Sequence, residues 1–164
     1  MINFDEKDFE YFDYIQEHKR NVLKAFNMLV DKTDVINSLS VKEAKTLRQR
    51  ALDHDLSKYS KQQFDLYCDK FFRKIECDFN SAWEHHYRNE LHHPEKYKEN
   101  KKEMELLDIL EMIIDWHAMS IKFNNSSLEY FLNKKEELKN NFNFLENNFE
   151  LIEDILKSLN KQVN

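Results

Sequence analysis

Histidine and carboxylate residues are concentrated in one part of this chain, in a pattern that suggests metal chemistry. All seven histidines lie between positions 18 and 117. Four of them form two doublets: His85, His86, His92 and His93. The stretch DHDLSK precedes the doublets and contains His54, Asp55 and Lys58. Imidazole nitrogens and carboxylate oxygens without thiolates suit Mn, Fe, Co, Ni or Zn. The residue types therefore predict a divalent-metal site.

Two further candidates lie on helices that the apolar pattern predicts. His18 falls within an apolar stripe of 3-4 spacing, and Asp115 lies in the nearly all-apolar stretch 106–123. A carboxylate inside a helical bundle destabilises it unless the carboxylate is paired, protonated or bound to a cation. Taken singly, His18 fits an ordinary core histidine and Asp115 fits a salt-bridge partner. Together with His54 and Asp55, on separate predicted helices, they form a set of metal ligands.

These residues resemble the motif of the HD-domain superfamily of metal-dependent phosphohydrolases. That motif runs His, then His-Asp, then Asp, and here it reads His18, then His54 and Asp55, then Asp115. The tracts HDLSK, AWxHH, NxHHPE and EMxxDWxAMS are also similar to those of small bacterial and phage proteins with an HD-like core. The resemblance covers about residues 14–123 and implies an all-helical fold.

The resemblance also implies a place for further ligands. Superfamily members with two metals carry two more histidines before the last Asp, and the stretch 85–93 is where these would fall. The resemblance favours His86 from the first doublet and leaves open which of His92 and His93 is a ligand, because a proline follows the second doublet. We interpret His85 as exposed or as a partner outside the ligand set.

Asp55 and Lys58 are the candidate catalytic residues. His54 and Asp55 are expected to leave a helix end in different directions, so that the histidine can hold one metal while the carboxylate reaches between two. Two metals can activate water and neutralise phosphoryl oxygens. Lys58, one turn after Asp55, could meet a phosphate oxygen or could be solvated. Glu111 is expected to accept the second N–H of a ligating imidazole, and His117 is interpreted as structural. The residues assigned to such outer contacts or to substrate are His85, Asn89 and Glu111.

The function implied by the resemblance is phosphate-ester hydrolysis that depends on one or two divalent metal ions per chain. The substrate would be a nucleotide or another small phosphorylated molecule. A diiron oxygenase on the same fold is the second hypothesis, and a non-catalytic metal-binding interaction module is the third. Ser57 stands where several superfamily members have glycine, and their nucleotide-specific loops have no counterpart here. The substrate is therefore not named by the resemblance.

Composition restricts the fold. The 164 residues include no glycine and one proline, which excludes Walker loops, Rossmann fingerprints and nucleophile elbows because each needs glycine. Ser or Asn followed three residues later by Glu or Gln marks helix starts, at Ser40, Ser60, Asn100 and Ser126. The apolar period predicts an all-α, single-domain bundle over residues 1–164. Its helices are expected at about 5–31, 41–54, 61–74, 78–92, 100–123, 127–139 and 142–162.

The remaining features concern partners and location. Residues 14–123 are expected to form the HD-like core and 127–163 a C-terminal helical extension. An apolar heptad seam over 142–163 predicts a helix that closes the bundle, and a homodimer through this helix is the second interpretation. The net charge of −6 is spread among interleaved residues, so no nucleic-acid partner is expected. No apolar run is long enough for a membrane span. Cys68 and Cys77 are expected to be reduced core residues in a cytoplasmic protein.

Overall fold

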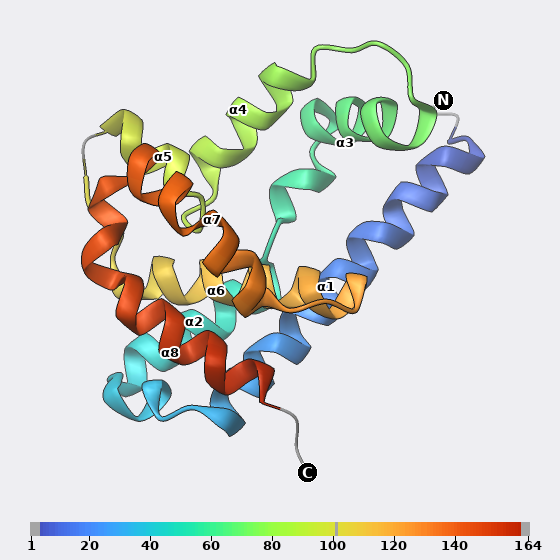
Figure 1. The fold of residues 1–164 in the computed structure, drawn as a ribbon. Coiled ribbons are helices and arrows are strands. Elements are labelled where there is room, and N and C mark those ends of the chain that lie inside the picture. Colours follow the sequence, from blue (N-terminus) through green and yellow to red (C-terminus); the bar gives the residue numbers. More distant parts are fainter. Residues whose placement is uncertain (1–3, 101, 162–164) are drawn as a thin grey trace.

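The chain folds into an all-helical structure, as the sequence predicts. We describe it from a computed structural model that covers residues 4–100 and 102–161. Every regular element in these ranges is helical, and Figure 1 shows their arrangement. The α-helices are α1 (Glu6–Lys32), α2 (Val41–Asp53), α3 (Lys61–Cys68), α4 (Phe79–Asn89), α5 (Pro94–Asn100), α6 (Leu106–Phe123), α7 (Ser127–Asn141) and α8 (Phe149–Asn160). Short 3-10 or π turns are η1 (Val35–Ser38), η2 (Leu56–Tyr59), η3 (Asp69–Arg73) and η4 (Asn143–Asn148).

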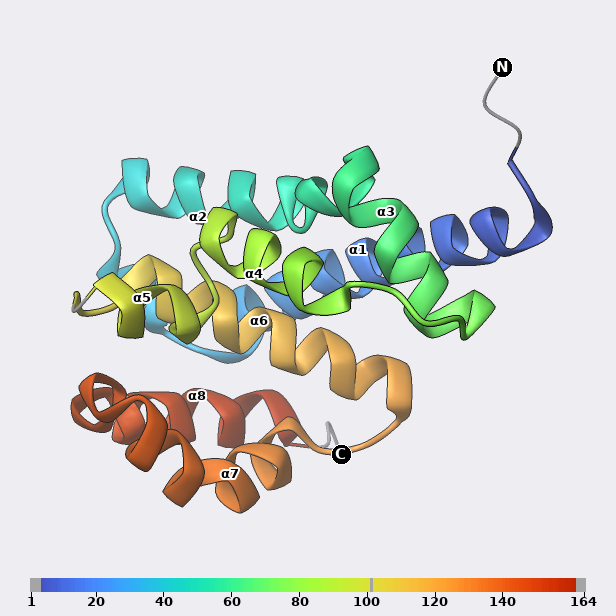
Figure 2. The same cartoon turned by 90° about the horizontal axis from the view of Figure 1, so that it is seen from above.

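Helix α6 is the central element, as its apolar composition predicts. It packs against α1 and α2 on one side and against α7 and α8 on the other, an arrangement that Figure 2 shows from above. Ile109, Leu110, Met112, Ile113 and Ile114 of α6 are all almost fully buried. Burial of such side chains stabilises the fold by about 1.5–3 kcal/mol each.

A second, smaller apolar cluster lies near the N-terminal half of α1. Tyr11 and Ile15 of α1 pack there with Tyr67 and Cys68 of α3, whereas Val22 and the apolar residues that follow it on α1 belong to the main core. The polar residue between these two clusters on the buried stripe of α1 is His18, which is 3% exposed. The fold therefore places a histidine at the boundary between two apolar cores.

The segment around the second histidine doublet differs from the prediction. The expected helix 78–92 ends at Asn89, and a separate helix α5 begins at Pro94. Proline suits the first position of a helix because its missing N–H would have no partner there. Pro94 therefore starts a helix after a break and does not simply end the preceding one.

The predicted start of the central helix at Asn100 is also wrong. Asn100 closes α5, and α6 begins only at Leu106. The backbone N–H of Glu105 donates to Oδ2 of Asp108 at 3.1 Å, so the helix is capped five residues later than the Asn100 pattern indicates. Among the other predicted starts, Ser40 forms the full reciprocal box with Glu43.

Two more predicted features are partly correct. The Ser126 hydroxyl accepts from the Glu129 N–H and starts α7, but the Ser60 side chain makes no capping bond. The expected helix 61–74 is α3 followed by the π turn η3. The expected helix 142–162 is the 3-10 turn η4 followed by α8.

The C-terminal apolar seam packs within the chain. Leu145, Ile152, Leu156 and Leu159 are at most 1% exposed, and α8 packs against α1, α6 and α7. The predicted helix that closes the bundle is thus present, whereas the homodimer stays a prediction. Val163, the last position of the seam, lies outside the described residues.

The described part of the chain contains neither a membrane-spanning helix nor a disulfide. Across residues 4–100 and 102–161, no helix combines the length and apolarity that crossing a bilayer would need. Cys68 and Cys77 are both free thiols. Cys68 is buried in the core as expected, but Cys77 is only half-buried.

Candidate metal centre

His54 and Asp55 follow the end of α2 with different backbone conformations. His54 caps the helix with an extended ψ of 131°, and Asp55 adopts the left-handed conformation, with φ 59° and ψ 22°. Asp tolerates this conformation better than most residues because its short polar side chain can bond locally. Both residues are 1% exposed. The turn therefore delivers two adjacent side chains into the interior, as expected from the sequence.

The first half of the site combines residues of α1, α2 and α6. Nε2 of His18 lies 3.1 Å from Oδ1 of Asp115 and 3.4 Å from Oδ2 of Asp55. Nε2 of His54 lies 3.5 Å from the same Asp115 oxygen and 3.7 Å from the same Asp55 oxygen. The ligand atoms of His18, His54 and Asp115 lie close enough together to hold a single metal ion.

The second half comes from α4 and from the break that follows it. Nε2 of His86 lies 3.3 Å from Oδ1 of Asp55 and 2.9 Å from Nε2 of His93. Nε2 of His92 lies 3.8 Å from Oδ1 of Asp55. Both histidines of the second doublet therefore reach the site with His86. They do so because the chain turns back between α4 and α5, which a continuous helix would prevent.

Asp55 joins the two halves. Its Oδ2 faces His18 and His54, and its Oδ1 faces His86 and His92. Oδ1 of Asp55 and Nε2 of His54 are buried and make no hydrogen bond within the described residues. Buried polar atoms are normally satisfied, so such orphans call for an ion or another ligand. The nitrogen and oxygen donor set, the orphan atoms and the burial together fit a divalent metal ion.

His54 and His86 hydrogen-bond polar partners through Nδ1, whereas Nδ1 of His18 and of His92 has no hydrogen-bond partner in the described residues. Oε1 of Glu111 lies 3.2 Å from Nδ1 of His54 and 3.5 Å from Nδ1 of His92. The Ser57 hydroxyl lies 3.1 Å from Nδ1 of His86. An acceptor at Nδ1 keeps the proton there and leaves Nε2 free for a metal. Glu111 thus takes the position that the sequence suggests for His54, and it lies within ion-pair distance of His92 without hydrogen-bonding it.

The charges of the site shift the pKa values of its groups strongly. Burial acts to raise the pKa of Asp55, but the charges of Lys58 and His54 outweigh it and hold that pKa well below its usual value. Burial also acts to raise the pKa of Asp115, but hydrogen bonds with His18 and His54 outweigh burial and hold that pKa well below its usual value. Burial lowers the pKa of His86 to about 3. Burial acts to lower the pKa values of His18 and His54, but Asp55 and Asp115 outweigh it, raise the pKa of His18 and bring that of His54 to about 10. The site therefore contains ionised carboxylates and a neutral His86, and metal binding would release a proton from His54.

Lys58 is directly paired with the bridging carboxylate. Its Nζ donates to Oδ2 of Asp55 at 2.5 Å, and its side chain is only 17% exposed. The interpretation of Lys58 as a solvated lysine is therefore wrong. The contact forms within the 3-10 turn η2, not along a regular α-helix.

Three histidine-region residues do not join the cluster. His85 is half-buried, and its Nδ1 lies 2.7 Å from the side-chain amide of the buried Gln63. Asn89 is exposed, and its amide donates to the backbone carbonyl of His85, so Asn89 does not orient a ligand. His117 is buried elsewhere and pairs with the Ser127 hydroxyl at 2.9 Å, which supports its structural interpretation.

Glu90 is a candidate that the sequence pattern does not reveal. It can supply a carboxylate oxygen to a group that also includes Asp55 and His86. Glu90 has the extended backbone that ends α4. The one sequence signal for Glu90 is its position between the two histidine doublets. A helix continued through residue 92 would have placed its side chain on another face.

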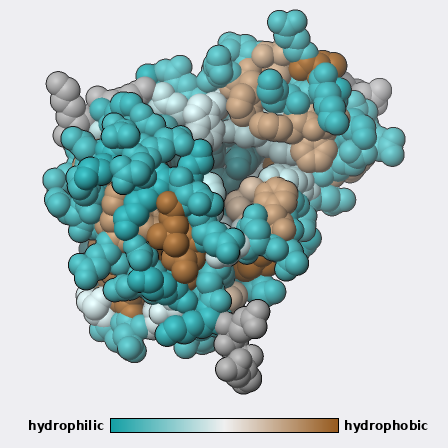
Figure 3. Space-filling model, viewed as in Figure 1, coloured by the Kyte–Doolittle hydropathy of each residue, from teal (hydrophilic) through white to brown (hydrophobic). Residues whose placement is uncertain are grey.

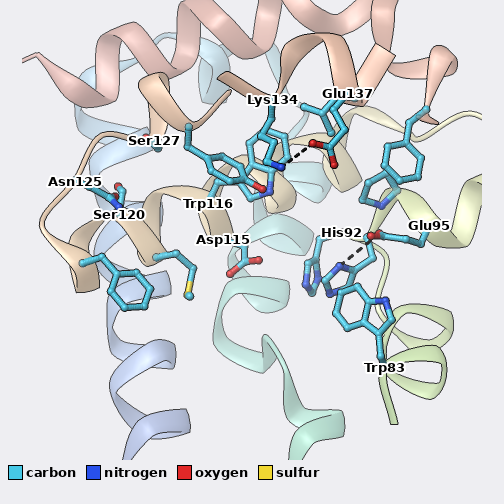
Figure 4. Close-up of a pocket in the computed structure, with 17 residues that line it drawn as sticks. Trp83, His92, Glu95, Asp115, Trp116, Ser120, Asn125, Ser127, Lys134 and Glu137 are labelled. Atoms are coloured by element: carbon cyan, nitrogen blue, oxygen red, sulfur yellow. Dashed lines mark hydrogen bonds and ion pairs between the residues drawn. The ribbon is translucent and has the colours of Figure 1, made fainter. Parts of the chain in front are cut away.

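Two cavities meet at the cluster. The first, here the α3–α4 cavity, has a volume of about 460 Å³ and includes Asp55, Lys58 and His86 in its lining. The second, the α7 cavity, has a volume of about 470 Å³. Figure 4 shows the α7 cavity with Asp115 on one side and the Lys134–Glu137 ion pair on the other. Both cavities are lined by Trp83, His92, His93, Asp115 and Met119. The surface is hollowed on the face between α3, α4 and α7 (Figure 3).

Comparison with known proteins gives a family. A family model described as "Family of unknown function (DUF5662)" matches residues 7–164. No curated protein and no solved structure matches the chain. Because the family model spans nearly the whole sequence, the chain belongs to the DUF5662 family.

Proposed function

We propose that this protein is a metal-dependent hydrolase of small phosphate esters, with Asp55 bridging two metal positions. The observation that carries the proposal is the division of the Asp55 carboxylate. One oxygen faces His18 and His54, and the other faces His86 and His92. A buried carboxylate shared by two sets of imidazoles is the arrangement that a pair of divalent ions needs.

The bound metals would polarise a phosphoryl oxygen and supply a water of lowered pKa. The protein's own residues have separate tasks. Glu111 holds His54 through a hydrogen bond at Nδ1 and lies beside His92. Lys58, which neutralises Asp55, can turn its ammonium toward a phosphate oxygen. The α3–α4 cavity of about 460 Å³ falls in the size range of small-ligand sites.

The donor set bears on metal identity and on location. Imidazoles and carboxylates without thiolate suit Mn, Fe, Co, Ni or Zn, and the two halves have room for one or two ions per chain. The free thiols of Cys68 and Cys77 fit a reducing compartment, and we expect the protein to work in the cytoplasm. The interleaved charges give no expectation of a nucleic-acid partner.

The proposal is tested with protein purified and then loaded with Mn or Co. The substrates are p-nitrophenyl phosphate, bis(p-nitrophenyl) phosphate and a panel of nucleoside phosphates. We expect turnover that a chelator removes and that the Asp55→Asn variant lacks. Asp53→Asn is the matched control, because Asp53 is an exposed carboxylate that bonds only Gln49. Stoichiometric metal without turnover on any of these substrates would sink the proposal.

The same experiment separates the two other hypotheses. Iron in the purified protein, with the electron paramagnetic resonance signal of a coupled pair, would indicate a diiron oxygenase in place of a hydrolase. Metal that raises thermal stability in wild type but supports no chemistry would indicate a metal-binding interaction module.

A further inference from the structure

Two buried tyrosine hydroxyls near the candidate metal ligands lack a hydrogen-bond partner in the described residues. Tyr11 is 1% exposed and Tyr67 is 7% exposed. Neither hydroxyl has a hydrogen-bond partner within the described residues, and both residues line the α3–α4 cavity. An unpaired buried hydroxyl destabilises a protein, because its hydrogen bond to water is lost and not replaced. Two such groups in one cavity, where phenylalanine would fill the same space, call for an explanation other than packing.

The two phenols adjoin the charged groups of the site. Nζ of Lys58 lies 5.7 Å from the centre of the Tyr67 ring, and the His86 ring meets Tyr67 from another side with a centroid distance of 6.0 Å. The rings of Tyr11 and Tyr67 are nearly parallel, with centroids 6.4 Å apart. Tyr11, Tyr67 and Lys58 therefore all contribute to the wall of the same cavity.

The phenols remain protonated at neutral pH. Burial, together with the charge of Asp55, raises the pKa of Tyr67 to about 12, although Lys58 acts in the opposite direction. Burial raises the pKa of Tyr11 as well, assisted by its neighbour Tyr67 and by Asp55. Each phenol can therefore donate an O–H hydrogen bond. Together with Lys58, the wall offers donors and a positive charge.

We propose that Tyr11, Tyr67 and Lys58 form the binding site for the non-bridging oxygens of a tetrahedral oxyanion, such as the phosphoryl group of a substrate. This proposal rests on the proposed function and names residues that position its substrate. An oxyanion offers several acceptor oxygens and would satisfy both hydroxyls at once. Aromatic neighbours such as Phe72 and Phe79 line the same cavity and restrict water there, which strengthens such hydrogen bonds.

The test uses inorganic phosphate as the probe. Its binding to the Mn-loaded full chain is measured by calorimetry for wild type, Tyr11→Phe and Tyr67→Phe. We expect each substitution to weaken phosphate binding about tenfold, because a hydrogen bond to a charged acceptor is lost. Tyr59→Phe is the control: the Tyr59 hydroxyl accepts from Gln16, and Tyr59 does not line this cavity. Its phosphate affinity should equal that of wild type.

Thermal unfolding without phosphate gives a second readout. A tyrosine needed for packing and a tyrosine that binds phosphate would change the melting temperature differently when replaced. Because each variant removes an unsatisfied hydroxyl and keeps the ring, its melting temperature should equal or exceed that of wild type. Lower phosphate affinity combined with unchanged or higher stability supports the site. Phosphate affinity equal to wild type in both folded variants overturns it, as does a wild-type protein that binds metal but no phosphate. Phosphate bound through the tyrosines without any ester turnover would refute the hydrolase and leave this site standing.

Discussion

Oε1 of Glu111 lies 3.2 Å from Nδ1 of His54. The carboxylate can therefore accept a hydrogen bond from the Nδ1–H that this imidazole must keep if its Nε2 is to bind a metal. The same oxygen lies 3.5 Å from Nδ1 of His92, which belongs to the other half of the cluster. Burial opposes ionisation of Glu111, but its contacts with His54 and His92 lower its pKa to about 2. Glu111 thus hydrogen-bonds His54 and lies beside His92, which belongs to the other half of the cluster.

Replacing Glu111 with glutamine should weaken metal binding without emptying the site. The amide keeps an acceptor oxygen but loses the charge, and loss of such an outer partner typically reduces metal affinity about 10–100-fold. The measurement is a competition titration against a chromophoric chelator. Glu103→Gln, at an exposed position outside the site, should bind metal like wild type. Equal affinities for the two variants would refute the role of Glu111.

The two halves of the site should lose metal separately. His18→Ala removes a residue facing Oδ2 of Asp55, and His93→Ala removes a neighbour of His86 in the other half. Elemental analysis of each purified variant should find about half the metal of a protein that binds two ions, whereas Asp55→Ala should lose both ions. His85→Ala, whose ring faces Gln63, serves as the control. Full metal content in Asp55→Ala would show that this carboxylate does not bridge.

Arg50 neutralises the acidic side of the cluster and should be needed for stability. Its Nη1 lies 2.6 Å from Oδ1 of Asp108 and 3.7 Å from Oε2 of Glu111, and both carboxylates are almost fully buried. Arg50→Met leaves both carboxylates without a cation, which should lower the free energy of unfolding by about 2–4 kcal/mol. The loss should not exceed that of a fully buried pair, because Arg50 is partly exposed. Urea denaturation measures this loss.

A matched comparison distinguishes lost charge from lost packing. Arg48→Met lies on the exposed side of the same helix and should change stability by less than about 0.5 kcal/mol. The double variant Arg50→Met with Asp108→Asn should recover part of the loss, because one unpaired charge is removed. If Asp108→Asn lowers the stability of Arg50→Met as much as it lowers that of wild type, the two substitutions are independent and the ion pair does not explain the effect.

His18 and Asp115 could be predicted from helix periodicity, and His54 and Asp55 from their adjacent pattern in the sequence. His18 interrupts an apolar stripe and Asp115 interrupts an apolar helix, and the 3.6-residue period is a local signal that tertiary packing preserves. The arrangement of His92 and His93 could not be predicted, because it depends on where α4 ends. The extended backbone at Glu90 and the return of the chain toward α5 are set by packing against the rest of the fold, which periodicity does not encode.

The phenols were missed for a different reason. Tyr11 and Tyr67 follow the apolar pattern of core residues, and their rings do belong to the core. Only the absence of a hydrogen-bond partner for each hydroxyl, which is a property of the tertiary structure, distinguishes them from phenylalanine. The composition correctly indicated helices without glycine loops. It could not indicate which side chains would bind an anion in place of the backbone amides of a glycine-rich loop.

The two cysteines should differ in reactivity, and the difference tests the burial of the smaller apolar cluster. Cys68 is fully buried, and burial raises the pKa of its thiol to about 11, so almost no thiolate is present at pH 8. Cys77 is half-buried. With a chromogenic disulfide reagent at pH 8, the folded protein should release about one equivalent of product per chain quickly, and Cys68→Ala should leave that fast phase unchanged. A Cys77→Ala variant should react only as fast as the protein unfolds, so its rate should rise with urea. A fast reaction of this variant in the absence of denaturant would show that α1 and α3 do not enclose Cys68 in solution.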